Sequence, residues 1–196
     1  MKILLLNASP KNDGATQEIL LTVQGALPAQ AESELVCLGD VNVQYCLGCK
    51  KCYETCRCVR QDGMTALLDK LEAADAFVIA APSYWADVPA QFKAFIDRCT
   101  PFSDTNPNPS HWTLGASKRC YAVALRTGSS PGECQHILDT IAHWCGHMGV
   151  EMAGSMYFCG IEDKGDIEPH KPAICAKTEK WFAEMADDKK LAKFDT

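Results

Sequence analysis

The chain has 196 residues, which is long enough to bury one full hydrophobic core without a second domain. Its composition, 47% apolar and 22% charged, is that of an ordinary globular protein and excludes wholesale disorder. The net charge of -6 at pH 7 leaves no basic face that could neutralise a phosphate backbone, so nucleic acid is excluded as a partner.

The first half of the chain alternates strands with helices. An apolar run over Lys2–Asn7 is typical of a parallel strand buried on both faces, and it is too short for a signal peptide. A polar turn over Ala8–Thr16 follows it. The next predicted elements are a helix over Gln17–Ala26, a strand over Ser33–Cys37, a cysteine-bearing connection over Leu38–Asp62, and a helix over Gly63–Ala73 with Asp62 as its N-cap.

The second half continues this alternation. The predicted elements are strands over Asp75–Ala81, Arg119–Leu125 and Glu151–Phe158, and helices over Ala90–Arg98, Glu133–Met148 and Lys171–Ala186. The loop over Cys99–Ser117, which carries Trp112, is longer than most connections, and this favours a functional role. We expect residues 1–186 to form a single domain and residues 187–196 to form a charged tail.

This alternation predicts an α/β fold, a parallel sheet with helices on both faces. Ligands of such sheets bind beyond the carboxyl ends of the strands. Three predicted loops lie at this edge, over Ala8–Thr16, Pro82–Pro89 and Arg126–Gly132, and the cysteine-bearing connection follows the second strand at the same edge. We therefore expect the functional site there.

The first of these loops is a candidate phosphate site. It leads from Ser9 to Thr16 into a helix, whose first backbone N–H groups lack partners and favour an anion. Ser9, Asn12 and Thr16 add side-chain donors. The loop lacks the glycines of the ATP-binding and dinucleotide-binding motifs, which disfavours those ligands. The alternative is an ordinary turn in which Thr16 only caps the helix, and the loop alone does not decide between the two.

The second loop places Pro82, Ser83, Tyr84 and Trp85 directly after a buried strand. Its aromatic rings and backbone amides suit contact with a flat heterocycle, and Trp85 can donate a hydrogen bond. Taken alone, the segment fits a surface packing cluster equally well. Because both loops project from one sheet edge, together they could grip a phosphate and a flat ring at once.

The cysteines form a third candidate site. Cys46, Cys49, Cys52 and Cys58 have the spacing C-x2-C-x2-C-x5-C, and Cys56 lies inside the same stretch. Such a loop can hold a [4Fe–4S] cluster or zinc, or carry free thiols or a disulfide. With 12 cysteines and no stretch of membrane-spanning length, we expect a cytoplasmic protein with reduced thiols and no membrane partner.

In this order, the motifs resemble the flavodoxin-like NADPH-dependent FMN reductase family and, within it, the iron–sulfur flavoproteins. The resemblance is carried by the first strand with its loop to Thr16, by the cysteines with Asp62-Gly63-Met64, by Pro82–Trp85 and by Lys93–Arg98. It implies a flavodoxin-like fold in which five parallel strands have the order 2-1-3-4-5. It also implies that the four spaced cysteines hold a [4Fe–4S] cluster.

The resemblance further implies that FMN is the cofactor. Its phosphate would lie among Ser9, Lys11, Gly14, Ala15 and Thr16, with Asn12 as a further donor. Its ring would contact Pro82, Ser83, Tyr84 and Trp85, and Thr127 and Gly128 would close a further side. Ala15 stands where the family often has Asn, and Gly63 where it often has Asp. The missing Asn side chain removes one potential hydrogen bond but leaves the backbone donors, so we expect weaker flavin retention at most.

The resemblance predicts an oxidoreductase that passes electrons from NAD(P)H to a quinone, a flavin, a disulfide or an iron–sulfur protein. No side chain is assigned a catalytic role, because the flavin ring carries the reaction. One alternative is a non-enzymatic electron carrier with a [4Fe–4S] cluster, and a second is a thiol or metal sensor. We expect a small-molecule or protein acceptor as partner, and a homo-oligomer, either a dimer or a tetramer.

Two sets of charged or titratable residues remain. His143 and His147 are four residues apart on a predicted helix, a spacing that can bind a metal ion. No carboxylate or third ligand lies nearby in the sequence, so helix packing or solvent exposure is favoured. Lys93, Asp97 and Arg98 are predicted to form a surface ion-pair set on another helix.

Overall fold

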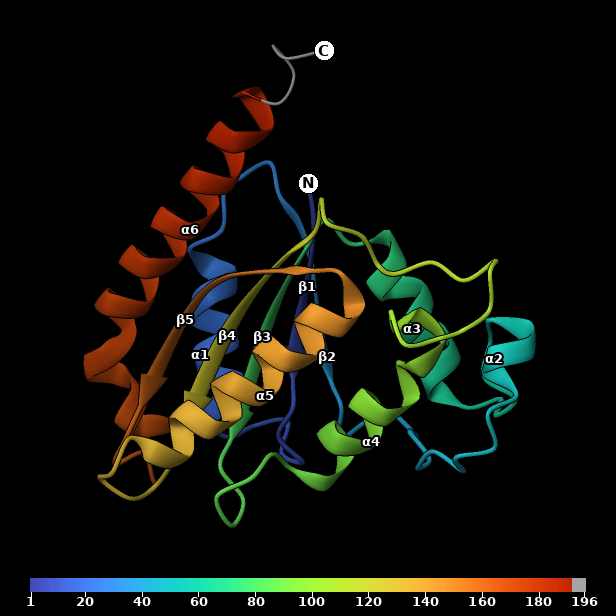
Figure 1. Cartoon of the computed structure of the whole chain (residues 1–196). Coiled ribbons are helices and arrows are strands. Elements are labelled where there is room, and N and C mark those ends of the chain that lie inside the picture. The colour runs from blue at the N-terminus through green and yellow to red at the C-terminus, as the bar shows by residue number, and fades with distance from the viewer. Residues whose placement is uncertain (192–196) are drawn as a thin grey trace.

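The computed structural model describes residues 1–191, and Figure 1 shows a central sheet flanked by helices. The strands are β1 (Lys2–Asn7), β2 (Glu32–Cys37), β3 (Ala76–Pro82), β4 (Arg119–Leu125) and β5 (Glu151–Phe158). The helices are α1 (Ala15–Gly25), α2 (Cys52–Thr55), α3 (Gly63–Ala73), α4 (Ala90–Arg98), α5 (Gly132–Met148) and α6 (Lys171–Leu191), with short 3-10 helices at Thr100–Phe102 and Lys164–His170. None of these helices combines the length and the hydropathy that a membrane-spanning helix requires.

The strands form one parallel sheet in the order β2-β1-β3-β4-β5, which confirms the predicted order. The central strand β3 pairs with β4 along its whole length, from Ala76 opposite Arg119 to Pro82 opposite Leu125. Because all the strands run in the same direction, their carboxyl ends meet at one edge of the sheet. The loops after β1, β3 and β4 therefore lie next to one another.

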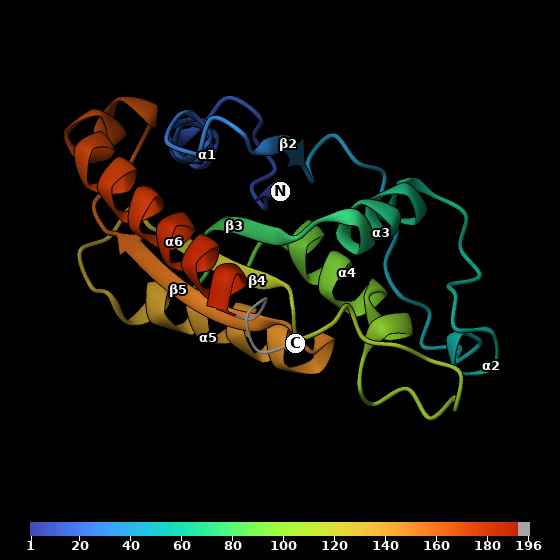
Figure 2. The same ribbon diagram turned by 90° about the horizontal axis from the view of Figure 1, so that it is seen from above.

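The sheet separates two hydrophobic cores, because successive side chains of a strand point to opposite faces. Leu4 and Leu6 belong to the core that α3, α4 and α5 cover, whereas Ile3 and Leu5 belong to the core that α1 and α6 cover. Figure 2 shows the two sets of helices on either side of the sheet. Burial on both faces explains why β1 is an unbroken apolar run.

Most of the predicted element bounds agree with the structure, and the differences have local causes. α1 begins at Ala15 instead of Gln17, because Gly14 has the extended backbone of an N-cap and its carbonyl accepts from the N–H of Glu18 at 3.1 Å. The single turn α2 within the cysteine-bearing connection is not predicted. α6 continues past Ala186 to Leu191, so the first part of the expected tail is helical, and residues 192–196 lie outside the described residues.

The long loop between α4 and β4 packs against the segment that carries the cysteines. Nδ2 of Asn106 donates to the carbonyl of Cys52 at 3.3 Å. Nδ2 of Asn108 donates to the carbonyls of Tyr53 and Glu54, each at 2.9 Å. The bonds from Asn108 satisfy two carbonyls that α2 is too short to pair, and the bond from Asn106 adds a second donor to the carbonyl of Cys52. The loop thus supports α2, a structural task that accounts for part of its length.

Trp112 of the same loop lies apart from the carboxyl edge of the sheet. Its ring meets that of Phe102 edge to face, with the centroids 6.0 Å apart. Its Nε1 donates to the Glu72 carboxylate of α3 at 2.8 Å. Trp112 therefore anchors the loop to α3 and does not cover a site at the carboxyl edge.

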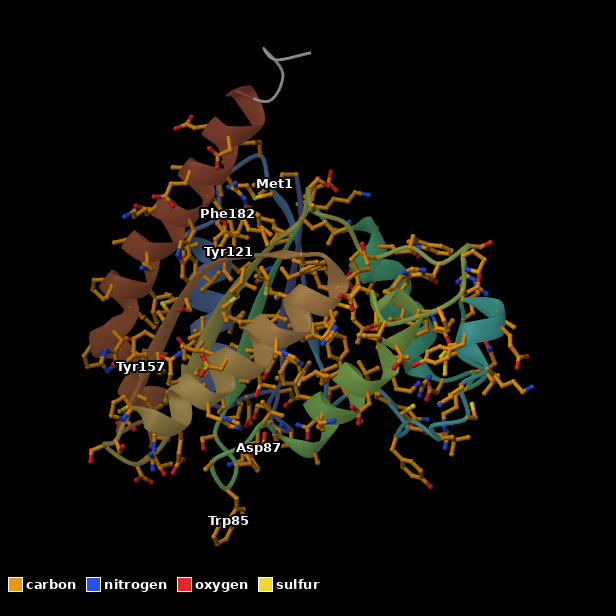
Figure 3. The ribbon with its side chains drawn as sticks, in the orientation of Figure 1. Met1, Trp85, Asp87, Tyr121, Tyr157 and Phe182 are labelled. Carbon is orange, nitrogen blue, oxygen red and sulfur yellow. The ribbon has the colours of Figure 1, made fainter. Side chains whose placement is uncertain are left out.

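The packing of α6 on the sheet depends on a glycine in β5. A Cβ on Gly154 would overlap the indole of Trp181, which is buried. Trp181 stacks on Tyr121 with the ring centroids 4.8 Å apart, and Tyr121 also contacts Phe182. Figure 3 shows Tyr121 and Phe182 close together where α6 covers the sheet. The indole is held by these neighbours and has little room to move.

Replacing Gly154 by Ala should therefore lower the free energy of unfolding by about 1–3 kcal/mol, because the added methyl group overpacks the contact with Trp181. Gly25→Ala, at the end of α1, is the matched control, since no atom lies within 4 Å of a Cβ there. It should leave stability unchanged or raise it by up to about 1 kcal/mol. Urea denaturation measures both variants, and equal stabilities would contradict this packing argument.

Candidate functional site

A cavity of about 550 Å³ opens at the carboxyl ends of β1, β3 and β4, a volume typical of a small-molecule pocket. The predicted cofactor-binding residues that line it are Ser9, Lys11, Gly14, Ala15, Thr16, Pro82, Ser83, Tyr84, Trp85 and Thr127. The lining also includes Asp13, Leu125, Arg126, Ile161, Glu162, Asp163 and Lys164, which are not predicted. The fold thus brings the three predicted loops together around one space.

Asn12 and Gly128 are the predicted residues that do not line the cavity. Nδ2 of Asn12 donates to both carboxylate oxygens of Asp40, at 3.2 and 3.1 Å, so its amide is already engaged. The carbonyl of Gly128 accepts from the N–H of Gly160 at 3.0 Å, and a Cβ at this position would collide with the guanidinium of Arg126. Gly128 therefore packs against Arg126, which lines the cavity, and does not line the cavity itself.

The loop after β1 is held in shape by a buried amide. Oδ1 of Asn7 accepts from the N–H of Ser9 at 2.9 Å, while its Nδ2 donates to the carbonyl of Lys11 at 3.0 Å and to Oε1 of Gln17 at 2.9 Å. Oγ of Ser9 accepts from the N–H of Lys11 at 3.1 Å. Asn7 is fully buried. The sequence pattern predicts Asn7 only as the end of a strand, although a polar residue directly after an apolar run is a signal for this role.

The start of α1 forms the anion-binding corner of the cavity. Gly14 is the N-cap, and no side chain caps the helix. The first N–H groups of a helix have no acceptor within the helix, and its dipole adds positive potential. Ala15 and Thr16 of this first turn line the cavity beside Lys11. Thr16 is not the N-cap that the alternative interpretation of this loop requires.

The loop after β3 forms a tight turn at the mouth of the cavity. The N–H of Tyr84 donates to the carbonyl of Asp87 at 2.8 Å, and the reverse bond is 3.1 Å. The two residues between them, Trp85 and Ala86, have φ of 53° and 63°, the left-handed values of a type I′ turn. Such values strain residues other than glycine. The turn projects the ring of Trp85 fully into solvent (Figure 3).

A carboxylate from α5 joins two walls of the cavity. Oε2 of Glu133 accepts from Oγ of Ser83 at 2.7 Å, and its Oε1 pairs with Nη2 of Arg126 at 3.1 Å. Nη1 of Arg126 donates to the carbonyl of Ser130 at 2.8 Å. Nε of Arg126 is buried and has no hydrogen-bond partner within the described part of the chain. An orphaned donor on a cavity wall is what an acceptor atom of a bound ligand would satisfy.

The cysteine-bearing connection forms a second, smaller pocket of about 30 Å³. Cys46, Cys49, Cys52 and Cys58 all line it. Cys56 is not part of this lining: it is buried, has the left-handed φ of 54°, and its N–H closes the turn of α2 on the carbonyl of Cys52 at 2.9 Å. The fold thus gathers the four cysteines of the predicted ligand set and separates the fifth.

Four thiols in one pocket are the donor set that a [4Fe–4S] cluster uses, and they also suit zinc. Burial, followed by the influence of the three neighbouring thiols, raises the pKa of Cys52, so a bound cation would be needed to hold its thiolate. In residues 1–191, no three or more Cys, His, Asp or Glu side chains are grouped so that they could hold a metal ion as they stand. The donor chemistry fits a cluster, and binding would draw the four thiols closer together.

Arg98, the last residue of α4, binds this connection on both sides of its four spaced cysteines. Its Nη1 donates to the carbonyl of Gln44 at 2.8 Å and to Oδ2 of Asp62 at 2.7 Å, and its Nη2 donates to Oδ1 of Asp62 at 2.9 Å. Both side chains are 1% exposed, which corrects the predicted surface position of Arg98. Asp62 also accepts from the N–H of Met64 and caps α3, as predicted. The guanidinium holds the pKa of Asp62 below its usual range.

The other end of α4 contacts the first loop. Nε2 of Gln91, in the first turn of α4, donates to the carbonyl of Ala8 at 3.1 Å. Together with Arg98 at its last position, this bond makes α4 a bridge between the loop after β1 and the cysteine-bearing connection (Figure 1). The two candidate sites are therefore held by one helix.

The NADPH-dependent FMN reductase family matches residues 1–159 of the sequence. The chain belongs to this family. An iron–sulfur flavoprotein of Clostridioides difficile is 31% identical over 161 residues, which cover 77% of this chain and 68% of that protein. An iron–sulfur flavoprotein of Methanocaldococcus jannaschii is 30% identical over 102 residues, which cover 52% of this chain and 53% of that protein. The match thus spans about half the length of the latter relative.

A solved structure supports the flavodoxin-like fold of this FMN reductase family member. The FMN-dependent NADH-azoreductase of Bacillus anthracis, determined in complex with FMN, superposes with a TM-score of 0.67 at 14% identity. The superposition covers 92% of this chain and 99% of that one. The predicted family and fold are confirmed, and the names of the sequence relatives agree with the predicted subgroup.

In this FMN reductase family member, Asp62→Asn should lower the free energy of unfolding at pH 7 by about 3–5 kcal/mol, because it leaves the charge of Arg98 buried without a counter-charge. Asp97→Asn is the matched control. Asp97 pairs with Lys93 on the exposed face of α4, as predicted, and such a pair contributes about 0–1 kcal/mol. Urea denaturation of both variants compares the two losses.

The difference between wild type and Asp62→Asn should also depend on pH. A carboxylate whose folded-state pKa is lowered adds stability above its ordinary pKa, and this stability is lost as the pH falls through the folded-state pKa. The gap between the two proteins should therefore shrink below about pH 4, the ordinary range of Asp. A gap that stays constant from neutral pH down to about pH 2 would contradict the assignment of the ion pair.

Proposed function

We propose that the chain is an oxidoreductase that binds FMN in the cavity of about 550 Å³ and receives electrons from NAD(P)H. The observation that carries the proposal is the uncapped start of α1, which opens into this cavity beside a loop that Asn7 holds rigid. Membership of the FMN reductase family gives the anion a chemical identity, the phosphate of FMN.

The residues of the cavity have distinct tasks in this proposal. The N–H groups at the start of α1, with Lys11, would hold the phosphate, and the segment Pro82–Trp85 would lie against the ring. Arg126 would present its orphaned Nε to an acceptor atom of the ligand. When bound, FMN would supply the hydride and single-electron chemistry, which no side chain here can provide. The protein itself would bind the flavin, orient it and shield it.

We further propose that Cys46, Cys49, Cys52 and Cys58 hold a [4Fe–4S] cluster. Three features support this: the shared pocket, the separate position of Cys56, and relatives that are named iron–sulfur flavoproteins. The acceptor of the electrons would be a quinone, a flavin, a disulfide or an iron–sulfur protein.

A second candidate function is electron transfer between proteins without turnover of NAD(P)H. The observation in its favour is the apolar surface beside the cysteine pocket, where Tyr45, Leu47 and Val59 are 71%, 56% and 49% exposed. Exposed apolar residues of this kind suit contact with a protein partner. Anaerobic mixing of the loaded protein with NADH, NADPH or a reduced ferredoxin-type donor separates the two functions. Rapid loss of the oxidised-flavin absorbance with a pyridine nucleotide supports the oxidoreductase, and reduction by the protein donor alone overturns it.

The anion-binding corner can be tested with two variants that differ only in charge. Ala15→Asp places a carboxylate in the first turn of α1, where the helix dipole tolerates it but a phosphate would be repelled. We expect its dissociation constant for FMN to be at least about tenfold higher than that of Ala15→Asn, whose amide adds a donor. Titration of the flavin-free protein with FMN, followed by flavin fluorescence, gives both constants. Equal constants would show that the phosphate lies elsewhere.

The cysteine pocket can be tested by a matched pair of serine substitutions. Cys49→Ser removes one thiol of the pocket, and we expect it to lose the iron and acid-labile sulfide of the anaerobically purified protein. Cys56→Ser alters a neighbouring thiol outside the pocket, and we expect it to keep both. Zinc without sulfide in the wild type would favour a metal sensor. Loss of iron from both variants would contradict the proposed ligand set.

A further inference from the structure

The second half of α5 carries a histidine pair that neither cofactor proposal uses. Nε2 of His143 and Nε2 of His147 are 3.2 Å apart. The two rings are nearly perpendicular, at 85°, with the centroids 4.6 Å apart, so they converge at an angle instead of meeting head on. His143 is exposed and His147 is partly exposed. The pair lines neither the large cavity nor the cysteine pocket.

The long loop supplies a carboxylate to this pair. Oδ1 of Asp104 lies 2.7 Å from Nδ1 of His147, and the N–H of Asp104 donates to the carbonyl of His147 at 2.9 Å. A carboxylate in this position fixes the proton on Nδ1 and leaves Nε2 of the neutral ring with a free lone pair. Asp104 is 43 residues from His147 in the chain, so the sequence around the pair does not reveal this carboxylate.

The separation of the two nitrogens matches that of two ligands of one metal ion. With metal–nitrogen bonds of about 2.0–2.1 Å, nitrogens 3.2 Å apart subtend an angle of about 100–106° at the ion, close to tetrahedral. In the metal-free protein, one proton between the two nitrogens would hold the pair. A metal ion would replace that proton, and Nδ1 of His143 would take it up.

The surroundings leave room for the remaining ligands of an ion. Both histidines line a cavity of about 320 Å³ together with hydroxyl side chains, among them Thr100, Ser103 and Thr140. Within residues 1–191, no third Cys, His, Asp or Glu side chain completes a ligand set here, so water would fill the other positions. Such a site exchanges its ion readily and differs in this from the four-thiol pocket.

The geometry points to a binding site for one divalent transition-metal ion, with Nε2 of His143 and Nε2 of His147 as its protein ligands and Asp104 as the residue that positions His147. Imidazole pairs of this kind select Ni²⁺, Cu²⁺ or Zn²⁺ over Mg²⁺ and Ca²⁺, which prefer oxygen ligands. A bound ion would tie the long loop to α5 through the bond between Asp104 and His147. The site is independent of the proposed flavin and cluster sites.

Calorimetric titration of the flavin-loaded protein with NiCl₂ tests this site. Any Ni²⁺ that binds to the cysteines does so in every variant. A difference between variants in the number of Ni²⁺ ions bound per chain therefore reports binding at the histidines. His143→Gln and His147→Gln should each remove one bound Ni²⁺ per chain. The matched control is His136→Gln, which removes an exposed histidine from the same helix and should bind as wild type does. Unchanged Ni²⁺ binding in both pair variants would overturn the proposal.

Asp104→Asn tests the positioning role separately. It should leave the number of bound ions unchanged and weaken binding about tenfold, the usual loss when a residue behind a ligand is changed. Long-range ¹H–¹⁵N spectra with Zn²⁺ as a second probe should shift the Nε2 signals of His143 and His147 in the wild type. A shift confined to one ring would overturn the two-histidine site, and equal affinity in Asp104→Asn would overturn the role of the carboxylate.

Discussion

Leu4, Leu5 and Leu6 of β1 are all buried, although they point alternately into two different cores. Burying an apolar side chain of this size contributes about 1.5–3 kcal/mol, and β1 also pairs along its length with β2 and β3. A register shift of one residue would move each leucine into the wrong core. The carboxyl ends of the central strands are therefore fixed relative to one another, and the loops that follow them meet around one cavity.

The same double burial explains why the inner strands could be predicted from the sequence. The predicted bounds of β1 and β4 agree with the structure at both ends. Each strand lies between two layers of helices, so its sequence is a run of apolar residues. The start of α1 and the whole of α2 were harder to place. α2 is a single turn, and its carbonyls at Tyr53 and Glu54 depend on Asn108 of a distant loop. The local sequence around α2 gives no sign of that support.

The candidate sites were predictable only where a loop carries its own chemistry. A helix start with hydroxyl and amide donors indicated the loop after β1, and aromatic residues indicated the loop after β3. Residues 161–164, which follow β5 and form another wall of the cavity, carry no recognisable motif. Asn7 looked like the end of a strand, and Arg98 looked like part of a surface ion pair. Both act through hydrogen bonds whose partners become neighbours only after folding, as Asp104 and His147 also do.

The position of α4 bears on electron transfer between the proposed flavin and cluster sites. Gln91 at one end holds the loop of the proposed flavin site, and Arg98 at the other end holds the cysteine-bearing connection on both sides of its four spaced cysteines. These two residues are separated by roughly 10 Å along the helix axis, a length set by backbone hydrogen bonds. Electron tunnelling decays steeply with distance. If FMN and the [4Fe–4S] cluster bind as proposed, α4 acts as a rigid spacer between them. It keeps the tunnelling distance nearly constant while the surface loops fluctuate.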